Sequence, residues 1–181
     1  AIHRLNAILE TGAHAEITDM NYDDAVRLAA DMADRHGWTL VQDTAWEGYE
    51  EIPQWIMEGY STLTSEIEDQ LAEQGGFMPT HLILQAGVGS FASGVLGAFA
   101  LLWGDRLPIT IIAEPEAAAC IYASAQAGDG KVRVVGGSLA TIMAGLACGE
   151  PNVLGWPILR DYAVAYASCQ DSVSACGMRL L

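Results

Sequence analysis

The sequence of 181 residues has few basic side chains and a single lysine, Lys131. Eight Lys and Arg residues stand against 23 Asp and Glu residues, which gives a formal net charge of -15. A surface of this charge repels nucleic acid phosphates and anionic lipid headgroups. The composition therefore argues against nucleic acid or an anionic membrane surface as a partner.

Long apolar runs are also missing. The longest candidate, residues 91–103, is shorter than the roughly 18 residues of a membrane span and contains Ser93, Gly94 and Gly97. We therefore expect a soluble protein. The first residues, 1–5, include no initiator Met and no signal peptide pattern, so we expect them to be a cut inside a helix of a longer protein.

The four cysteines, Cys120, Cys148, Cys169 and Cys176, form no CxxC pair and are too sparse for a disulfide scaffold. Free thiols in a reducing cytoplasm are the expectation. A disulfide between Cys120 and Cys148 stays open, because it requires that their helices adjoin. The four histidines share no metal-ligand spacing, so no metal site is predicted.

The chain is 51% hydrophobic and 17% charged, which is enough apolar material for a sizeable core. Short apolar runs alternate with longer periodic ones, and this predicts an α/β protein with a parallel sheet flanked by helices. We expect strands at residues 13–18, 39–42, 81–85, 108–113, 132–135 and 163–168. We expect helices at residues 22–36, 53–74, 91–103, 117–125, 140–147, 154–161 and from 171 onward.

The helix at residues 22–36 has the clearest end signals. Asn21 is a favourable N-cap, and Asp23 and Asp24 lie in the first turn, where acidic residues are stabilised. Gly37 follows the last turn and is expected to end the helix.

A glycine loop follows the predicted strand 81–85 and leads into the helix 91–103. It contains Ala86, Gly87, Val88, Gly89, Ser90 and Phe91. Glycines allow a positive φ and a close approach of the backbone to a ligand, and successive N–H groups at a helix start face an anion. The pattern predicts a phosphate or carboxylate site, in which Ser90 serves either as a hydroxyl donor or as the N-cap.

Taken alone, the glycine loop has two other interpretations. Residues 87–92 match the G-x-G-x-x-A variant of the dinucleotide fingerprint, and Glu114 ends the next predicted strand, where a ribose-binding acid would lie. This favours a NAD(P)-dependent oxidoreductase. The same loop is also compatible with a tight turn that binds no ligand, in a non-catalytic α/β module.

The surrounding motifs resemble a known family. Pro108 and residues 111–117, Ile-Ile-Ala-Glu-Pro-Glu-Ala, follow the loop as in pyridoxal-phosphate enzymes of the tryptophan-synthase-like fold, fold type II. The resemblance to the diaminopropionate ammonia-lyase family is more specific and extends from about residue 8 to 181. It is carried by Thr-Asp-Met-Asn-Tyr-Asp-Asp at 18–24, Val-Gln-Asp-Thr-Ala-Trp-Glu-Gly-Tyr at 41–49, Ala-Thr-Ile-Met-Ala-Gly-Leu-Ala-Cys-Gly-Glu-Pro at 140–151 and Ser-Cys-Gln-Asp-Ser-Val at 168–173.

This resemblance implies a fold, a reaction and an assembly. The fold is a partial three-layer αβα fold type II enzyme, with residues 1–44 as the C-terminal part of the small domain and 45–181 as part of the large cofactor-binding domain, both incomplete. The reaction is α,β-elimination of a small amino acid, 2,3-diaminopropionate, to pyruvate and ammonia. The assembly is a cytoplasmic homodimer with one pyridoxal 5'-phosphate per subunit, held by the loop Gly87 to Phe91.

Asp43 matches an active-site aspartate of the family and is the candidate catalytic base or second proton-transfer group. A carboxylate at a strand end beside an aromatic side chain is expected to have a pKa raised by desolvation. The alternative is that Asp43 only caps its loop by bonding to backbone N–H groups. Trp46 and Tyr49 either wall the site or pack at a domain interface.

The lysine that holds the cofactor covalently in this family has no counterpart here. Lys131 lies in the turn 128–131, which we expect to be solvated. In the family the cofactor lysine lies upstream of every motif quoted above, and the group that faces the pyridine nitrogen lies downstream. We therefore expect this chain to be inactive by itself.

Overall fold

The computed structural model describes residues 2–180, and the chain divides into two compact units, residues 1–38 and 39–181. Whether residues 1–44 and 45–181 are the small and large domains of the family stays a prediction. The first unit contains α1 (Ile2–Glu10) and α2 (Tyr22–His36).

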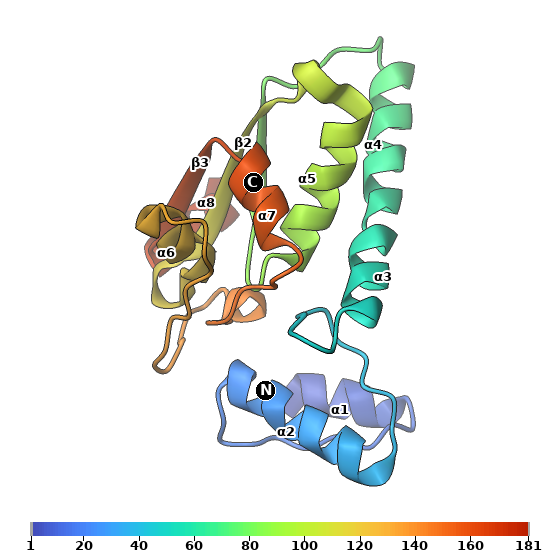
Figure 1. Ribbon diagram of the computed structural model, residues 1–181, viewed down its shortest axis with the longest axis vertical. Helices are drawn as coiled ribbons and strands as arrows, with labels where there is room; N and C mark the ends of the chain where they lie inside the picture. The colour runs from blue at the N-terminus through green and yellow to red at the C-terminus, as the bar shows by residue number, and fades with distance from the viewer. Residues whose placement is uncertain (1, 181) are drawn as a thin grey trace. The chain divides into compact units, whose positions relative to one another are not determined.

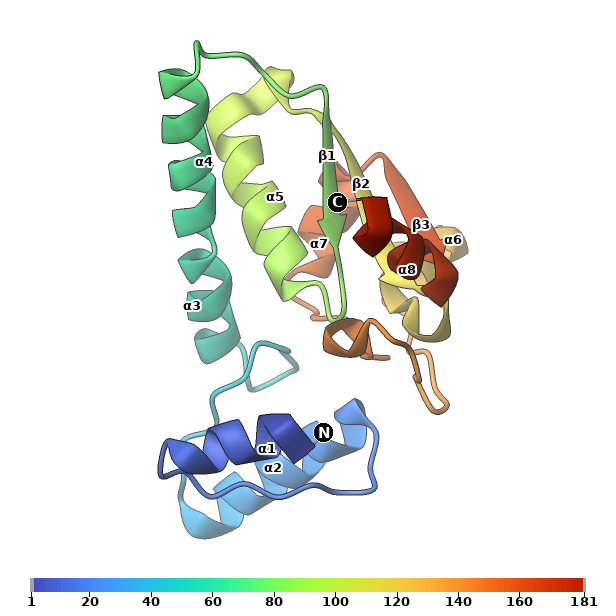
Figure 2. The same ribbon diagram turned by 180° about the vertical axis from the view of Figure 1, so that it is seen from behind.

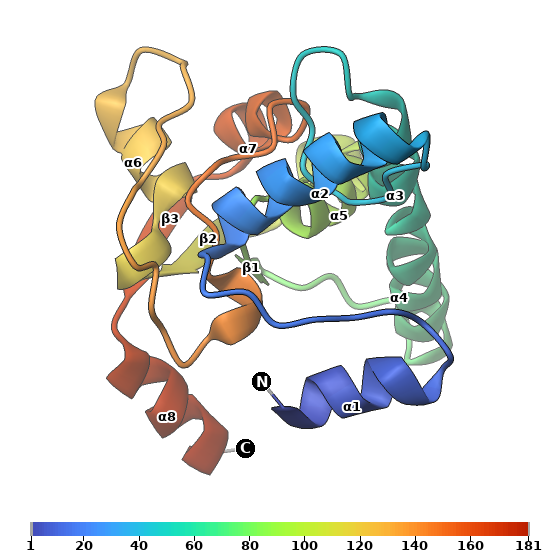
Figure 3. The same cartoon turned by 90° about the horizontal axis from the view of Figure 1, so that it is seen from below.

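The predicted ends of α2 are confirmed. The backbone N–H of Asp24 donates to the Asn21 side chain at 2.9 Å, and Gly37 adopts φ 65 at the C-terminus. The predicted strand at residues 13–18 is wrong, because the connection between α1 and α2 pairs with no strand among the described residues (Figure 3).

The second unit contains a three-stranded sheet and its helices. In chain order the elements are α3 (Glu51–Gly59), α4 (Ser61–Glu73), β1 (His81–Gln85), α5 (Ser90–Trp103), β2 (Ile109–Pro115), α6 (Cys120–Ala127), α7 (Trp156–Tyr162), β3 (Ala165–Cys169) and α8 (Asp171–Leu180). Three 3-10 turns accompany them, η1 (Gly104–Arg106), η2 (Glu116–Ala118) and η3 (Ala144–Leu146).

The strands pair in the order β1-β2-β3, and both pairings are parallel. Leu84 of β1 lies opposite Ile112 of β2, which lies opposite Tyr166 of β3. The helices α5, α6 and α7 lie on one face of the sheet, and α8 lies on the other (Figures 1 and 2). The predicted parallel sheet with flanking helices is therefore confirmed.

The core of this unit lies between the sheet and α5. Leu84 and Ile112 of the sheet pack with Leu96 and Phe99 of α5 in one buried cluster. Because α5 is apolar on nearly its whole circumference, it can be covered on several sides at once. Its last residue, Trp103, donates to the Glu68 carboxylate of α4 at 2.5 Å, which joins the C-terminal end of α5 to α4.

Four other predicted elements differ from the structure. Residues 39–42 and 132–135 form no strand among residues 2–180, and residues 140–147 form only the short turn η3. The long helix predicted at 53–74 is two helices, α3 and α4, which meet at Tyr60. Among the described residues no helix is both long enough and apolar enough to cross a membrane.

Two glycines of α5 provide a matched test of how closely α3 and α5 pack. A Cβ at Gly94 would lie 2.6 Å from the backbone oxygen of Met57 in α3, whereas a Cβ at Gly97 would meet only the Ile158 side chain at 3.5 Å. Gly94→Ala should therefore lower the free energy of unfolding by about 1 to 3 kcal/mol, since backbone must move. Gly97→Ala should be neutral or raise it by about 0.5 to 1 kcal/mol through helix propensity.

Urea unfolding of the two variants and the wild type measures both changes. Equal effects of the two substitutions would contradict the close backbone contact between α3 and α5.

Candidate functional site

The turn from β1 to α5 is built around Gly89. This residue is the N-cap of α5 and adopts φ 96, a conformation that favours glycine. A Cβ at this position would lie 3.0 Å from Leu159 and 3.3 Å from Ile121. The turn therefore requires glycine both for its backbone conformation and for its packing.

The turn presents backbone N–H groups that the protein itself does not use. Among residues 2–180, no backbone hydrogen bond is donated by the N–H groups of residues 87–92, while Ala86 donates to Ala113 at 2.9 Å and Ser93 donates to Gly89. These groups lie at the N-terminal end of α5, where the helix dipole is positive. The arrangement suits an anion such as a phosphate.

The 3-10 turn η3 forms a wall beside Gly87. A Cβ at Gly87 would lie 3.3 Å from Cα of Leu146, 3.6 Å from the carbonyl of Gly145 and 3.2 Å from Sγ of Cys148. The Cys120 thiol donates to the Gly87 carbonyl at 3.6 Å. Both cysteines are buried thiols, and no disulfide joins them.

The segment that carries η3 is anchored by the first residue of α8. Oγ1 of Thr141 and the backbone N–H of Ile142 donate to the two carboxylate oxygens of Asp171, at 2.5 and 3.1 Å. Nearby, the buried Leu139 adopts φ 52. This anchor could not be predicted from local sequence signals, because Thr141 and Asp171 are 30 residues apart.

Asp43 belongs to the loop that precedes α3, and its backbone contacts Ser90, the first residue of α5. Its carbonyl accepts hydrogen bonds from the Ser90 hydroxyl at 2.7 Å and from the Asn152 amide at 2.8 Å. Burial raises the pKa of the Asp43 carboxyl, although bonds to its own backbone and to Ser90 act in the opposite direction. Burial and the Asp43 charge also raise the pKa of Tyr60, whose ring packs edge-on against Phe91 at 5.2 Å.

The predicted role of Ser90 as the N-cap is wrong, while its role as a hydroxyl donor to an anion stays a prediction. The N-cap is Gly89, and Ser90 is the first residue of α5. Its side chain is 1% exposed, donates to the Asp43 carbonyl and accepts from the Asn152 amide at 2.7 Å. The hydroxyl therefore joins Asp43 to the loop. The unused backbone N–H groups of residues 87–92 are the donors available to an anion.

Trp46 and Tyr49 shape the loop that carries Asp43. Their rings stack with centroids 4.6 Å apart. The Tyr49 hydroxyl donates to the carbonyl of Leu40 at 2.9 Å and accepts from the backbone N–H of Gln42 at 3.1 Å. These contacts hold residues 40–49 as a closed loop.

Glu114 caps α6. Its carboxylate is 1% exposed and accepts from the backbone N–H groups of Ile121 and Tyr122, at 2.9 and 2.6 Å. Burial raises the pKa of Glu114 to about 7, and these two hydrogen bonds act in the opposite direction. Since α6 uses both oxygens, the carboxylate is not presented to a ribose, and this removes the support that Glu114 gave to the dinucleotide interpretation.

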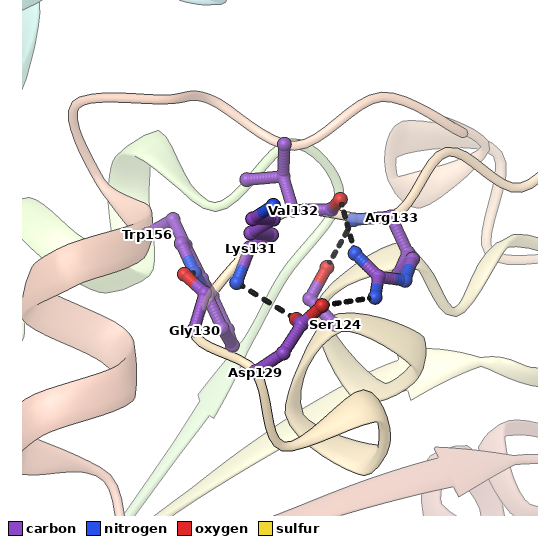
Figure 4. A network of polar contacts seen from close by, with 7 residues as sticks. All are labelled: Ser124, Asp129, Gly130, Lys131, Val132, Arg133 and Trp156. Carbon is purple, nitrogen blue, oxygen red and sulfur yellow. Dashed lines mark hydrogen bonds and ion pairs between the residues drawn. The ribbon is translucent and has the colours of Figure 1, made fainter.

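Lys131 lies on the exposed loop that follows α6 (Figure 4). Asp129 accepts from the Lys131 backbone at 3.1 Å and from the Arg133 guanidinium at 2.6 Å. Trp156 donates to the Gly130 carbonyl at 2.7 Å, and the Arg133 backbone donates to Ser124 at 2.7 Å. Lys131 itself is exposed, as expected for a solvated position, and its loop is held by two exposed contacts to Asp129 and by two part-buried contacts to Ser124 and Trp156.

The structure offers a further hollow but no metal site among its described residues. The described residues bring together no group of three His, Cys, Asp or Glu side chains that could hold a metal ion. A groove of about 560 Å³ lies between α3, α5 and α7. Met57, Gly97, Leu101 and Ile158 are among the residues that make its lining largely apolar, and it lacks the N–H groups of the glycine loop.

Comparison with known proteins agrees with this geometry. The family model for pyridoxal-phosphate dependent enzymes matches residues 2–181. Diaminopropionate ammonia-lyase of Escherichia coli (strain K12) is 56% identical over 181 residues, which are 100% of this chain and 45% of that protein. The enzyme of the same name from Salmonella typhimurium is 55% identical over 98% of this chain and 44% of its own length.

A solved structure gives the same result. The crystal structure of diaminopropionate ammonia lyase from Escherichia coli, in complex with an aminoacrylate-PLP azomethine reaction intermediate, superimposes with a TM-score of 0.92 at 55% identity. It is matched over 100% of this chain and 45% of its own length. The resemblance seen in the sequence motifs is confirmed, and the chain spans less than half the length of these relatives.

Glu114 should make the stability of the chain depend on pH. Its pKa is about 7 in the folded chain against an ordinary value of 4.5, so its stabilising contribution is fully present below pH 4.5 and is lost as the pH rises through 7. Glu114→Gln does not titrate. As the pH rises from 5 to 7, the free energy of unfolding should fall more steeply in the wild type than in this variant. The two slopes should differ by up to about 1.4 kcal/mol per pH unit.

Urea unfolding of both forms at pH 5, 6, 7 and 8 measures the difference. Parallel curves for wild type and variant between pH 5 and 7 would show that Glu114 does not titrate in this range.

Proposed function

The chain belongs to the pyridoxal-phosphate dependent enzymes, and on this premise we propose that the protein in its full length cleaves 2,3-diaminopropionate to pyruvate and ammonia. The observation that carries the proposal is the joining of the glycine loop to Asp43 by Ser90 and Asn152. In this proposal the contact would hold the anion-binding loop beside the proton-transfer group. The high identity to two diaminopropionate ammonia-lyases supports this substrate.

The residues of the glycine loop fit the phosphate of the cofactor. The unused N–H groups of residues 87–92 would hold it. Gly87 and Gly89 let the loop pack closely against η3, Ile121 and Leu159 in the conformation that presents these groups. No basic side chain belongs to this loop, so neutral donors and the α5 dipole would balance the phosphate charge. When bound, pyridoxal phosphate supplies an electron sink for the charge that develops at the substrate α-carbon.

Asp43 would carry a proton in the elimination. The reaction removes a proton from the α-carbon and delivers one to the departing amine, so it needs a group that can do both. Burial raises the pKa of Asp43, which brings that pKa closer to neutrality. Phe91 and Tyr60 lie beside the same loop and would limit the access of water.

The covalent attachment of the cofactor would come from outside this chain. Lys131 is the single lysine of the sequence, and it lies on the exposed loop after α6. We expect a lysine of the full-length protein to take this role, and the 181-residue chain by itself to show no turnover. We also propose a cytoplasmic homodimer with one cofactor per subunit, on the strength of the family resemblance.

The test is turnover by the full-length protein. With pyridoxal phosphate and 2,3-diaminopropionate it should release pyruvate and ammonia, measured by lactate dehydrogenase coupling and by an ammonia assay. D-serine and L-serine serve as alternative amino acid substrates. Faster release of pyruvate from either serine than from diaminopropionate would overturn the proposed substrate.

Asp43→Asn should lower kcat by roughly 10² to 10⁴-fold, because the amide keeps the shape but cannot exchange the proton. In the wild type, kcat/KM should fall on acidification at a pH above the ordinary carboxyl pKa of 3.8, since the pKa of Asp43 is raised and a base must be deprotonated. Steady-state kinetics from pH 5 to 9 measure both effects.

The control is Asp69→Asn, which removes an exposed carboxylate of α4 and should leave kcat unchanged. Wild-type kcat in Asp43→Asn would remove Asp43 from the mechanism.

A further inference from the structure

Asn152 is a buried polar residue between η3 and α7, with 0% exposure. Its side-chain nitrogen donates to the Asp43 carbonyl at 2.8 Å and to the Ser90 hydroxyl at 2.7 Å. Its side-chain oxygen accepts from the backbone N–H groups of Leu154 at 2.9 Å and Gly155 at 3.4 Å. Both ends of the amide are therefore used.

The backbone of Asn152 is fixed as well. Its N–H donates to the carbonyl of Val88 at 2.7 Å, and its carbonyl accepts from Trp156, the first residue of α7, at 3.1 Å. Asn152 thus bonds to the glycine loop on both sides of Gly89, through Val88 and through Ser90. It is one residue that contacts the glycine loop, the Asp43 loop and the start of α7.

We propose that Asn152 is a positioning residue that sets the place of Asp43 relative to the glycine loop. This inference rests on the proposed function, in which Asp43 moves a proton. Asn152, Ser90 and the Asp43 carbonyl form a closed triangle of three hydrogen bonds, so Asp43 cannot shift without breaking two of them. Burial keeps water from replacing the lost partners.

The two ends of the amide can be separated by substitution. In Asn152→Asp one carboxylate oxygen still accepts from Leu154 and Gly155, so the turn into α7 keeps its bonds. The other oxygen replaces the donor and meets the Asp43 carbonyl, which is also an acceptor. The variant therefore breaks the link to Asp43 and preserves the turn.

The control is Thr110→Val. Thr110 is also 0% exposed and donates to the carbonyl of Pro108 at 3.1 Å, close to the amino end of β2. The glycine loop follows the carboxyl end of β1, and the strands are parallel, so Thr110 lies at the opposite end of the sheet. This substitution removes a buried hydrogen bond without touching the triangle.

The first measurement needs no bound cofactor. Amide hydrogen exchange of the cofactor-free full-length protein should be roughly tenfold faster over residues 42–46 in Asn152→Asp than in wild type, and unchanged over β1 and β2. Thr110→Val should leave residues 42–46 at the wild-type rate. Unchanged exchange over 42–46 in Asn152→Asp would overturn the inference.

The second measurement is kinetic, in the cofactor-loaded protein. Per folded molecule, Asn152→Asp should lower kcat by roughly 10²-fold, because a misplaced reacting group costs about that much, while KM changes less than threefold. Thr110→Val should keep wild-type kcat. Faster exchange with wild-type kcat would show a purely structural role and overturn the inference.

Asn152→Ala removes the donor to the Asp43 carbonyl without burying a carboxylate and covers the case in which Asn152→Asp does not fold. It should also speed exchange over residues 42–46 and lower kcat, and a wild-type result in both measurements would sink the inference. Absence of diaminopropionate turnover in the wild type would instead sink the proposed function, while the exchange result would still decide whether Asn152 holds Asp43.

Discussion

The left-handed turn at Gly89 is the constraint on which the rest of the candidate site depends. It directs the chain from the end of β1 into α5 with no side chain at the point of closest approach. Leu159 of α7 and Ile121 of α6 can therefore lie against the backbone itself. Because Val88 and Ser90 lie on either side of this turn, the segments that bond to them are held at fixed positions around the N-terminal end of α5.

Local signals predicted the elements that their own residues stabilise. The helix α2 has its cap at Asn21 and its stop at Gly37, and both work within a few residues of the chain. Strand β1 was also placed correctly, because the glycine loop marks its end. The runs at 13–18, 39–42 and 132–135 have strand composition but no ladder among the described residues, since pairing depends on neighbours far away in sequence.

The sequence predicted residues of the candidate site but not the hydrogen bonds that join them. The glycine loop and Asp43 were both visible, the first as a pattern and the second through family motifs. The sequence did not show that Asn152, which is 109 residues from Asp43, joins them. Nor did it show that the Ser90 hydroxyl donates to the Asp43 carbonyl. A lone asparagine in a loop has no periodicity or spacing that marks it, and only the folded packing gives it a role.

The scarcity of lysine also means that an amine-reactive reagent can modify a single side chain of this sequence. Lys131 is the single side chain of this kind, and it lies on an exposed loop whose backbone is held by Asp129. The neighbouring residue, Gly130, accepts a hydrogen bond from the Trp156 indole. A dye coupled to Lys131 would therefore be attached at one defined position, near Trp156 of α7. Because tryptophan can quench a dye, its fluorescence intensity would report movement of this loop relative to α7.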